Sequence, residues 1–335
     1  MDDMINTAIK KLTDQQDLTY DEMNDVMNEV MGGKTGDIEI SSFLTSLSIK
    51  GESIEEIAGA AASMRDHAAE FDSQIDAIDI VGTGGDHSNS FNISTTTGLV
   101  LASLGIPVVK HGNRAASSKS GAADMLQALG FNINLTQAES EKMLADKNFC
   151  FLFAQKYHQA MRFVAPVRKT LGIRTIFNVL GPLANPAHAK KQVLGVYDES
   201  LLMPLAKTLI QLGVTNGKVI FGTDGLDEAS ISAPTKVVNI VDGVISEDEI
   251  TPEQFGLNRY AKEEIVGGTP EDNAQITRDI IDGKRDAKRD VVLLNAGLAI
   301  NTYRPDVSIQ QGIEMAQEAI DSGKTRKLLD ELLAY

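Results

Sequence analysis

The chain has 335 residues, 42% of them hydrophobic, which is enough for a sizeable core in one large or two medium domains. Its formal net charge of −16 argues against nucleic-acid binding and against binding to an anionic membrane, and no run of about eighteen apolar residues predicts a membrane span. Cys150 is the only cysteine, so no intrachain disulfide can form, and we expect a cytoplasmic protein.

The first part of the chain predicts helices only. Thr19 with Glu22, and Ser53 with Glu56, form two capping-box patterns, each just before apolar residues at helical spacing. Glycines separate the expected helices. We therefore expect a small helical domain over residues 1–72.

From residue 75 onward, short apolar runs alternate with helical patterns. We expect strands at 75–81, 107–110, 149–153, 191–197, 217–222 and 236–241, and helices at 95–104, 119–129, 137–146, 158–170, 201–212, 270–282, 285–300, 307–321 and 325–333. This alternation predicts an α/β fold with a mostly parallel sheet and helices on both faces, over residues 73–335. The stretch 172–190 reads as irregular, and 180–186, with two prolines, is not expected to form regular structure.

A glycine-rich loop follows the first expected strand. Residues 82–86 read GTGGD, and three glycines there let the backbone take positive φ and approach a ligand closely. Successive bare N–H groups form a seat for an anion such as phosphate. The alternative is a tight strand–helix turn without a ligand. The spacing matches neither the dinucleotide fingerprint nor the P-loop.

Hydroxyls and amides then crowd residues 88–97, SNSFNISTTT, just before an apolar helical pattern. They are ordinary N-cap residues on one interpretation. On the other, the cap, the helix N-terminus and the glycine loop converge on a phosphate.

The basic loop 110–121 follows the second expected strand and contains Lys110, Arg114 and Lys119. A solvated loop is the simpler interpretation. However, residues 87–197 hold twelve Lys or Arg and four acids, a net charge of +8, so the rest of the chain carries −24. Such a positive block in an acidic protein favours a small polyanionic substrate. Because both loops follow strands, we expect them at the carboxyl edge of the sheet.

Six motifs in order give the chain a resemblance to the anthranilate phosphoribosyltransferases. They are GTGGD at 82–86, NIST at 92–95, KHGNR at 110–114, VRKTLGIRT at 167–175, NVLGPLANP at 178–186 and TDGLDE at 223–228. The resemblance covers nearly the whole chain. It implies a small helical domain, joined by the 170–190 region, beside a large α/β domain, usually in a homodimer.

The resemblance also implies the reaction. The 5-phosphoribosyl group of 5-phosphoribosyl 1-diphosphate passes to the amine of anthranilate, and pyrophosphate leaves, in an early step of tryptophan synthesis. The implied cofactor is Mg²⁺, as two ions, and the implied partners are the two small-molecule substrates. Mg²⁺ and fixed N–H donors would stabilise the leaving charge.

Site residues are carried over position by position. The implied donor site is Gly82, Gly85, Asp86, Ser90, Asn92, Ile93, Ser94, Thr95, Lys110, His111, Gly112, Asn113, Arg114, Ala115, Ala116, Ser117, Ser118 and Ala122. The implied anthranilate site is Gly82, Asn113 and Arg168, and the implied metal ligands are Ser94, Asp227 and Glu228.

Two of these assignments have a simple structural alternative. Asp227 and Glu228 lie in a sequence with strong turn character and could form an exposed turn. Arg168 could satisfy carbonyls at a helix end instead of holding a carboxylate. We assign no acid or base, because an aromatic amine is nucleophilic without prior deprotonation. His111 and His158 are candidates only for lining the site.

The chain departs from the family pattern at four positions. Ala122 stands where serine is common, Gln155 and Gln159 stand where proline is usual, and His87 stands where glycine is common. Two other functions stay open: a pyrimidine-nucleoside phosphorylase, which shares the architecture, and a non-catalytic relative that binds nucleic acid. The net charge argues against the second.

Overall fold

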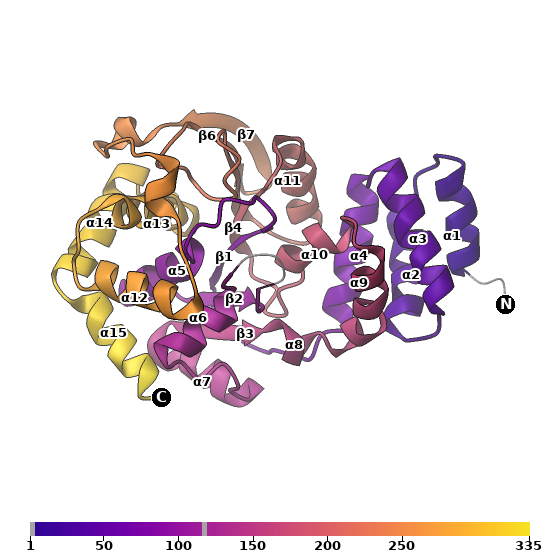
Figure 1. Cartoon of the computed structure of the whole chain (residues 1–335), viewed down its shortest axis with the longest axis horizontal. Helices are drawn as coiled ribbons and strands as arrows, with labels where there is room; N and C mark the ends of the chain where they lie inside the picture. Colours follow the sequence, from indigo (N-terminus) through magenta and orange to yellow (C-terminus); the bar gives the residue numbers. More distant parts are fainter. Residues whose placement is uncertain (1–3, 116–118) are drawn as a thin grey trace.

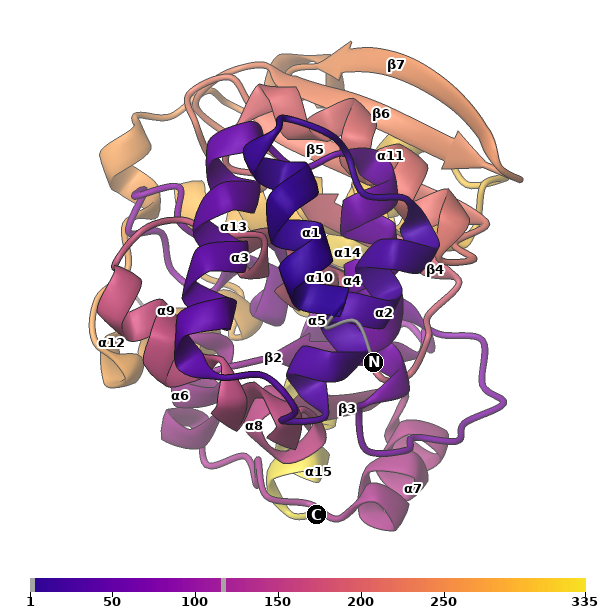
Figure 2. The same ribbon diagram turned by 90° about the vertical axis from the view of Figure 1, so that its right-hand side faces the viewer.

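The structure, a computed structural model, describes residues 4–115 and 119–335. Its N-terminal part is a bundle of four helices, which stands at one end of the molecule (Figures 1 and 2). These are α1 (Met4–Thr13), α2 (Tyr20–Met31), α3 (Asp37–Lys50) and α4 (Ile54–Asp66). Both expected capping boxes are present, at Thr19 for α2 and at Ser53 for α4. The helical prediction for this part is therefore confirmed.

A seven-stranded sheet forms the centre of the larger part, in the order β3-β2-β1-β4-β5-β6-β7. Its strands are β1 (Ile78–Gly82), β2 (Val108–Gly112), β3 (Phe149–Phe153), β4 (Lys191–Gly195), β5 (Asn216–Gly222), β6 (Thr235–Val241) and β7 (Val244–Ile250). Neighbours from β3 to β5 pair in parallel, and β6 and β7 add an antiparallel edge. The prediction of a mostly parallel sheet is confirmed.

The edge strand β7 is one that the sequence analysis missed. It reads VISEDEI, and most of its side chains are exposed, so it lacks the apolar run by which the other strands were recognised. The signal lay in the turn instead. Asp242 and Gly243 both have positive φ, 49° and 78°, as a two-residue hairpin turn requires. An Asp-Gly pair after an apolar strand would have predicted this hairpin.

Helices cover both faces of the sheet, as expected. On one face α5 (Ile93–Ser103) and α13 (Ala287–Tyr303) pack against β1. On the other, α11 (Leu202–Gln211) packs against β5 and α10 (Phe177–Leu183) against β2. The remaining helices are α6 (Ala122–Leu129), α7 (Gln137–Lys147), α8 (Ala154–Tyr157), α9 (Ala165–Leu171), α12 (Pro270–Ile281), α14 (Ile309–Asp321) and α15 (Lys324–Leu333).

The two faces of the sheet have separate cores, because alternate residues of a strand face opposite sides, and a smaller third cluster surrounds Cys150 and Leu152 of β3. Val193 of β4 belongs to the core under α5 and α13. Its neighbour Leu194 belongs to a second core, which continues without a break into the helical bundle through Met64 and Phe43. The bundle is thus packed onto one face of the sheet, and Figure 2 shows it in front of the strands.

Two expectations between residues 158 and 190 were wrong. The helix expected at 158–170 is a 3₁₀ turn at Gln159–Phe163 followed by α9. The stretch 180–186 was expected to lack regular structure, yet α10 runs to Leu183 with Pro182 inside it. A proline removes one hydrogen bond from a helix. In a helix of only seven residues that loss is small against the burial of Leu180 and Leu183, which are both fully buried.

Candidate active site

The carboxyl ends of the parallel strands bring four segments of the chain to one edge of the sheet. The glycine-rich loop follows β1, the basic loop follows β2, the segment 223–230 follows β5, and α5 begins close by at Ile93. Hydrogen bonds link all four segments. The glycine-rich loop and the start of α5 bond to 223–230, and Lys110, the first residue of the basic loop, bonds to the start of α5. The expected placement of both loops at this edge is confirmed.

The acidic pair Asp227–Glu228 lies at the centre of this arrangement. The two residues are 8% and 7% exposed, so they do not form the exposed turn that their local sequence allowed. The backbone N–H of Gly84 donates to Asp227 Oδ2 over 2.6 Å, and the N–H of Ser94 donates to Glu228 Oε1 over 3.1 Å. Glu228 therefore contacts the predicted donor residue Ser94, whereas Asp227 contacts Gly84 of the glycine-rich loop, which was not among the predicted donor residues.

Glycine is required where the strands meet this pair. A Cβ on Gly82 would lie 2.3 Å from Asp227 Oδ2, and one on Gly195 would lie 1.6 Å from the Asp227 carbonyl oxygen. Neither distance is compatible with a side chain. Gly195, at the end of β4, was missed by the sequence analysis, because nothing in its local sequence reports a contact with residue 227.

Asn295 of α13 holds the residue that follows the pair. Its Oδ1 accepts from the N–H of Ala229 and its Nδ2 donates to the Ala229 carbonyl, both over 3.0 Å. The side chain is 1% exposed. It was also missed, although an amide within the apolar run 291–300 was a signal that could have identified it.

Burial and mutual repulsion act on the protonation of the pair. Burial raises the pKa of Glu228 to about 7. Burial, then the nearby charges of Asp86 and Glu228, raise the pKa of Asp227 well above its usual range. Carboxylates gathered this way favour a cation, which would relieve their repulsion.

The donor set suits magnesium. Carboxylate and hydroxyl oxygens are hard ligands, and Mg²⁺ is commonly held by one or two carboxylates while substrate phosphates and water complete its shell. In residues 4–115 and 119–335, no three Asp, Glu, His or Cys side chains are placed to hold a metal by themselves.

Lys110 is the cation nearest to this centre. It is 2% exposed, and its Nζ donates to the Ile80 carbonyl over 2.6 Å and to Ser94 Oγ over 3.1 Å. Burial lowers its pKa, while the charges of Asp79, Glu228 and Asp227 act in the opposite direction. Lys110 thus lies among the acidic pair and Ser94, not in a solvated loop.

The rest of the basic loop is organised by an acid that was not predicted to have a role. Asp124, at the start of α6, accepts from Arg114 Nη1 and from the N–H of Ala115, both over 2.8 Å, and from the N–H of Gly121 over 3.0 Å. Both ends of the loop are therefore attached to α6. Ala116, Ser117 and Ser118 lie outside the described residues.

Most other predicted donor residues lie on or beside these segments. Asp86 Oδ2 lies 3.5 Å from the Asp227 nitrogen, and Arg174 Nη2 donates to the Gly85 carbonyl over 2.8 Å. Ser90 pairs with Val266, a segment to which the sequence analysis gave no role. Ile93 and Thr95 are buried at the start of α5.

The end of β2 is closely packed. A Cβ on Gly112 would lie 3.1 Å from the Cβ of Ala122, so Ala122, which stands where serine is common in the family, adjoins the strand end.

His111 is buried, and its ring meets that of His158 edge to face, with centroids 5.0 Å apart. Both histidines have a pKa lowered chiefly by burial. Neutral rings fit a lining role.

The predicted acceptor residues come from three different elements: Gly82 ends β1, Asn113 follows β2, and Arg168 lies on α9. Asn113 Oδ1 accepts from the N–H of Arg114 over 2.8 Å and lies 3.4 Å from Gln155 Nε2. Arg168, on α9, lies over the Phe177 ring at 5.2 Å. Among the described residues its guanidinium forms no ion pair and no hydrogen bond to a carbonyl, so the helix-end role that its sequence allowed is not observed.

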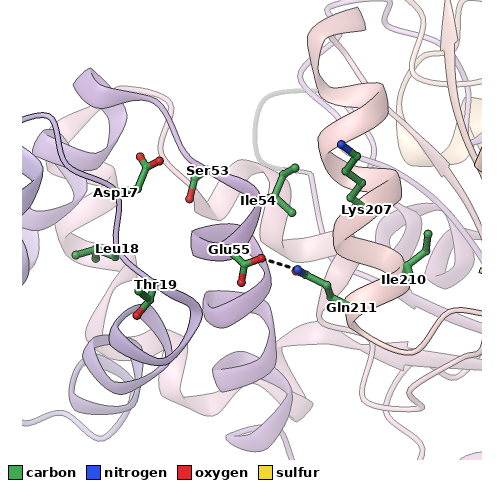
Figure 3. A pocket seen from close by; sticks show the side chains of 9 residues that line it. All are labelled: Asp17, Leu18, Thr19, Ser53, Ile54, Glu55, Lys207, Ile210 and Gln211. Atoms are coloured by element: carbon green, nitrogen blue, oxygen red, sulfur yellow. Dashed lines mark hydrogen bonds between the residues drawn. The ribbon is translucent and has the colours of Figure 1, made fainter.

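A cavity of about 640 Å³ lies elsewhere, where α4 meets α11 (Figure 3). Leu18, Ile54 and Ile210 line it, and a hydrogen bond of 2.7 Å joins Glu55 to Gln211. None of its lining residues was predicted to have a function. It lies between the helical bundle and α11, a helix that covers one face of the sheet.

Comparison with known proteins agrees with this fold. A glycosyl transferase family α/β-domain model matches residues 74–326, and a helical-bundle-domain model of the same family matches residues 6–68. The anthranilate phosphoribosyltransferase of Lacticaseibacillus casei is 55% identical, over 99% of this chain and 97% of its own length. The enzyme of Methanobrevibacter smithii is 49% identical, over 99% of each chain.

The chain belongs to the anthranilate phosphoribosyltransferase family. Two solved structures of that family show the same fold. The Thermus thermophilus enzyme has a TM-score of 0.92 at 39% identity, over 98% of each chain. The Saccharomyces cerevisiae enzyme, in complex with PRPP and Mg, has a TM-score of 0.92 at 30% identity, over 100% of this chain and 98% of that one.

No helix among the described residues is long and apolar enough to cross a membrane.

Proposed function

We infer that this chain transfers the 5-phosphoribosyl group from 5-phosphoribosyl 1-diphosphate to the amine of anthranilate. The anthranilate nitrogen forms a bond to ribose C1 while the bond from C1 to pyrophosphate breaks. The electron pair leaves with the pyrophosphate, and the nitrogen loses one proton. One structural observation carries this inference: a buried carboxylate pair held against glycine strand ends, beside a buried lysine and a helix N-terminus.

The donor would bind with its phosphoryl groups at this edge of the sheet. Bare N–H groups of the glycine-rich loop, Lys110 and the start of α5 supply positive potential there. Bound Mg²⁺ would neutralise charge on the leaving pyrophosphate. We propose Ser94, Asp227 and Glu228 as its ligands, and two ions, because Asp86 adds a further carboxylate next to Asp227.

Anthranilate would be held through its carboxylate. We propose Arg168 for this role, because a half-buried guanidinium without an acidic partner matches a bidentate carboxylate. Burial lowers its pKa, which a bound carboxylate would reverse. Asn113 and the backbone of Gly82 complete the proposed acceptor site.

Loss of anthranilate fluorescence tests the reaction. The expected result is a decay that requires both 5-phosphoribosyl 1-diphosphate and Mg²⁺, and that stops when either is left out. Phosphorolysis of thymidine or uridine without phosphoribosyl transfer would instead favour the nucleoside phosphorylase. Salt-sensitive DNA binding by an inert enzyme would favour the non-catalytic relative.

We also propose a domain boundary near residue 72. The 170–190 region would belong with the helical domain, because α9 packs on α3 and α10 packs on α4. The Arg65 side chain adds a 2.6 Å hydrogen bond to the Leu183 carbonyl. A cytoplasmic location is proposed as well; Cys150 is a buried free thiol, which suits a reducing compartment.

A homodimer is the last part of the proposal. Ile38 and Ile49 on α3 are 79% and 73% exposed, and Met4 on the adjacent α1 is 39% exposed. Exposed apolar side chains on neighbouring helices are typical of a covered surface. Sedimentation of the double variant Ile38→Glu, Ile49→Glu tests this, with Ala138→Glu at an exposed position on α7 as a control for added charge. We expect a monomer for the double variant, and an unchanged mass would contradict the assignment of this face.

A further inference from the structure

Asn273 is a buried amide that no part of the proposed reaction has yet used. It lies on α12 and is 1% exposed. Its Nδ2 donates to Asn92 Oδ1 over 2.9 Å, and its Oδ1 accepts from the N–H of Gly268 over 2.8 Å. Asn92 directly precedes α5 and belongs to the proposed donor site. The two residues are far apart in sequence, so only the fold brings them together.

The Asn92 amide is also bound from the basic loop. Its Nδ2 donates to the Ser120 carbonyl, and its Oδ1 accepts from Ser120 Oγ, both over 3.2 Å. One side chain therefore joins the start of α5, the end of the basic loop and α12. With two of its acceptor positions and one of its two N–H groups used, Asn92 keeps a single N–H for a ligand.

The direction of every bond in this chain follows from its two ends. The Ser120 carbonyl can only accept, so it fixes the Asn92 amide with Nδ2 toward it and Oδ1 toward Asn273. The Gly268 N–H can only donate, so it fixes Asn273 with Oδ1 toward it and Nδ2 toward Asn92. An asparagine at position 273 satisfies both neighbours at once, and an aspartate satisfies only Gly268.

The backbone around Asn273 is docked closely on the same loop. The N–H of Gly267 donates to the Asn89 carbonyl over 2.8 Å, and the N–H of Phe91 donates to the Ile265 carbonyl over 3.2 Å. A Cβ on Gly267 would lie 2.7 Å from the Phe91 Cα. The segment before α12 is thus a support for residues 89–92, and its buried amide acts on the last of them.

We propose that Asn273 is a positioning residue for the phosphoribosyl donor. It fixes the orientation of the Asn92 amide, and through Ser120 it ties the basic loop to the start of α5, so that both present their donors to one ligand. It does not touch the substrate itself. This inference rests on the proposed function, because the ligand that is positioned is 5-phosphoribosyl 1-diphosphate.

Calorimetric binding of 5-phosphoribosyl 1-diphosphate in the presence of Mg²⁺ tests the proposal, together with separate KM values for the two substrates. Asn273→Asp keeps the acceptor for Gly268 and loses only the donor to Asn92. We expect the donor Kd and donor KM to rise roughly tenfold, as for a buried hydrogen bond, while the anthranilate KM changes by less than about twofold. A purely structural role would not separate the two KM values.

The matched control is Asn301→Ala, which removes another amide hydrogen bond, from Asn301 Nδ2 to the Val307 carbonyl over 2.8 Å. It should lower the melting temperature without changing donor binding. An equal loss of donor affinity in this control would overturn the proposal, and so would unchanged donor affinity in a folded Asn273→Asp.

A second variant decides the matter if Asn273→Asp does not fold. Ser120→Ala removes the other donor to Asn92 Oδ1 and should weaken donor binding by a smaller factor, roughly threefold. An unchanged donor Kd there would overturn the proposal. If the unaltered protein binds no 5-phosphoribosyl 1-diphosphate, the proposed function is wrong, and this inference falls with it.

Discussion

The two charged segments at the edge of the sheet are built in opposite ways. The acidic segment around Asp227 is buried, and strand-end glycines and Asn295 hold its backbone. In the basic segment 110–121, Lys110, His111 and Ser120 are buried among the described residues, while Arg114 pairs with Asp124 at the surface over 2.8 Å.

The two segments differ in where the free-energy penalty of charge lies before a ligand binds. In the acidic segment the folded protein carries that penalty, because burial and repulsion raise the pKa values of its carboxyl groups, and a bound cation would relieve the repulsion. On the basic side the exposed guanidinium already has an acidic partner, and a surface ion pair is weak enough for a phosphate to replace it. The carboxylates of the acidic segment are thus already held in position in the protein without ligand.

Gly195→Ala should disrupt the packing of the acidic segment against β4 most strongly. The new Cβ would lie 1.6 Å from the Asp227 carbonyl oxygen, so β4 and the acidic segment must move apart. We expect a loss of roughly 4 kcal/mol or more in the free energy of unfolding, measured with urea. Gly98→Ala is the control, since its Cβ meets ordinary contacts at 3.4 and 3.5 Å. Equal stability of the two variants would contradict the close packing.

Asp227→Asn separates activity from stability. Removal of this carboxylate takes away a proposed metal ligand, and we expect activity to fall on the order of 100-fold. The group has a folded pKa above its unfolded value, so its charge destabilises the fold near neutral pH. We therefore expect the free energy of unfolding without ligands to rise by roughly 1 kcal/mol at pH 7. A variant that loses stability in thermal or urea melts would show that the pair is not strained.

Arg168→Ala tests whether the acceptor site is separate from both charged segments. We expect the anthranilate KM to rise roughly tenfold to a hundredfold, as for the loss of a hydrogen-bonded charge, with little change in the donor KM. Lys169→Ala, at the exposed neighbouring position, is the control. An unchanged anthranilate KM would remove Arg168 from the acceptor site.

The substitution His111→Gln, at a buried position of the basic segment, has the smallest expected effect, a change in the pH dependence of the unfolding free energy. Burial, and then the charge of His158, lower its pKa to about 3. Between about pH 3 and 6.5 the unfolded chain therefore binds more protons than the folded one. We expect the protein to lose unfolding free energy relative to His111→Gln as the pH falls below 6.5, by at most about 1.4 kcal/mol per pH unit. If the unfolding free energies of the two proteins have the same pH dependence, the lowered pKa of His111 is contradicted.

Much of the fold was readable from local sequence. Capping boxes marked α2 and α4, short apolar runs marked six of the strands, and the alternation of elements put both loops at one edge of the sheet. Three features were misread. Pro182 suggested irregular structure where buried leucines form α10, the helix expected at 158–170 is a 3₁₀ turn followed by α9, and the acidic β7 lacked the apolar run of the other strands.

By itself the sequence determined the family, the helical and α/β parts, and the residue types that the site offers. Only the tertiary structure decided that Asp227 and Glu228 are buried, that Gly195 must lack a side chain, and that Asn273 reaches Asn92. The physical reason is the range of the interactions. Caps and periodicity involve neighbours in the chain, whereas burial of a polar group is set by segments a hundred or more residues away, and a short acidic turn looks the same in the sequence whether it is exposed or covered.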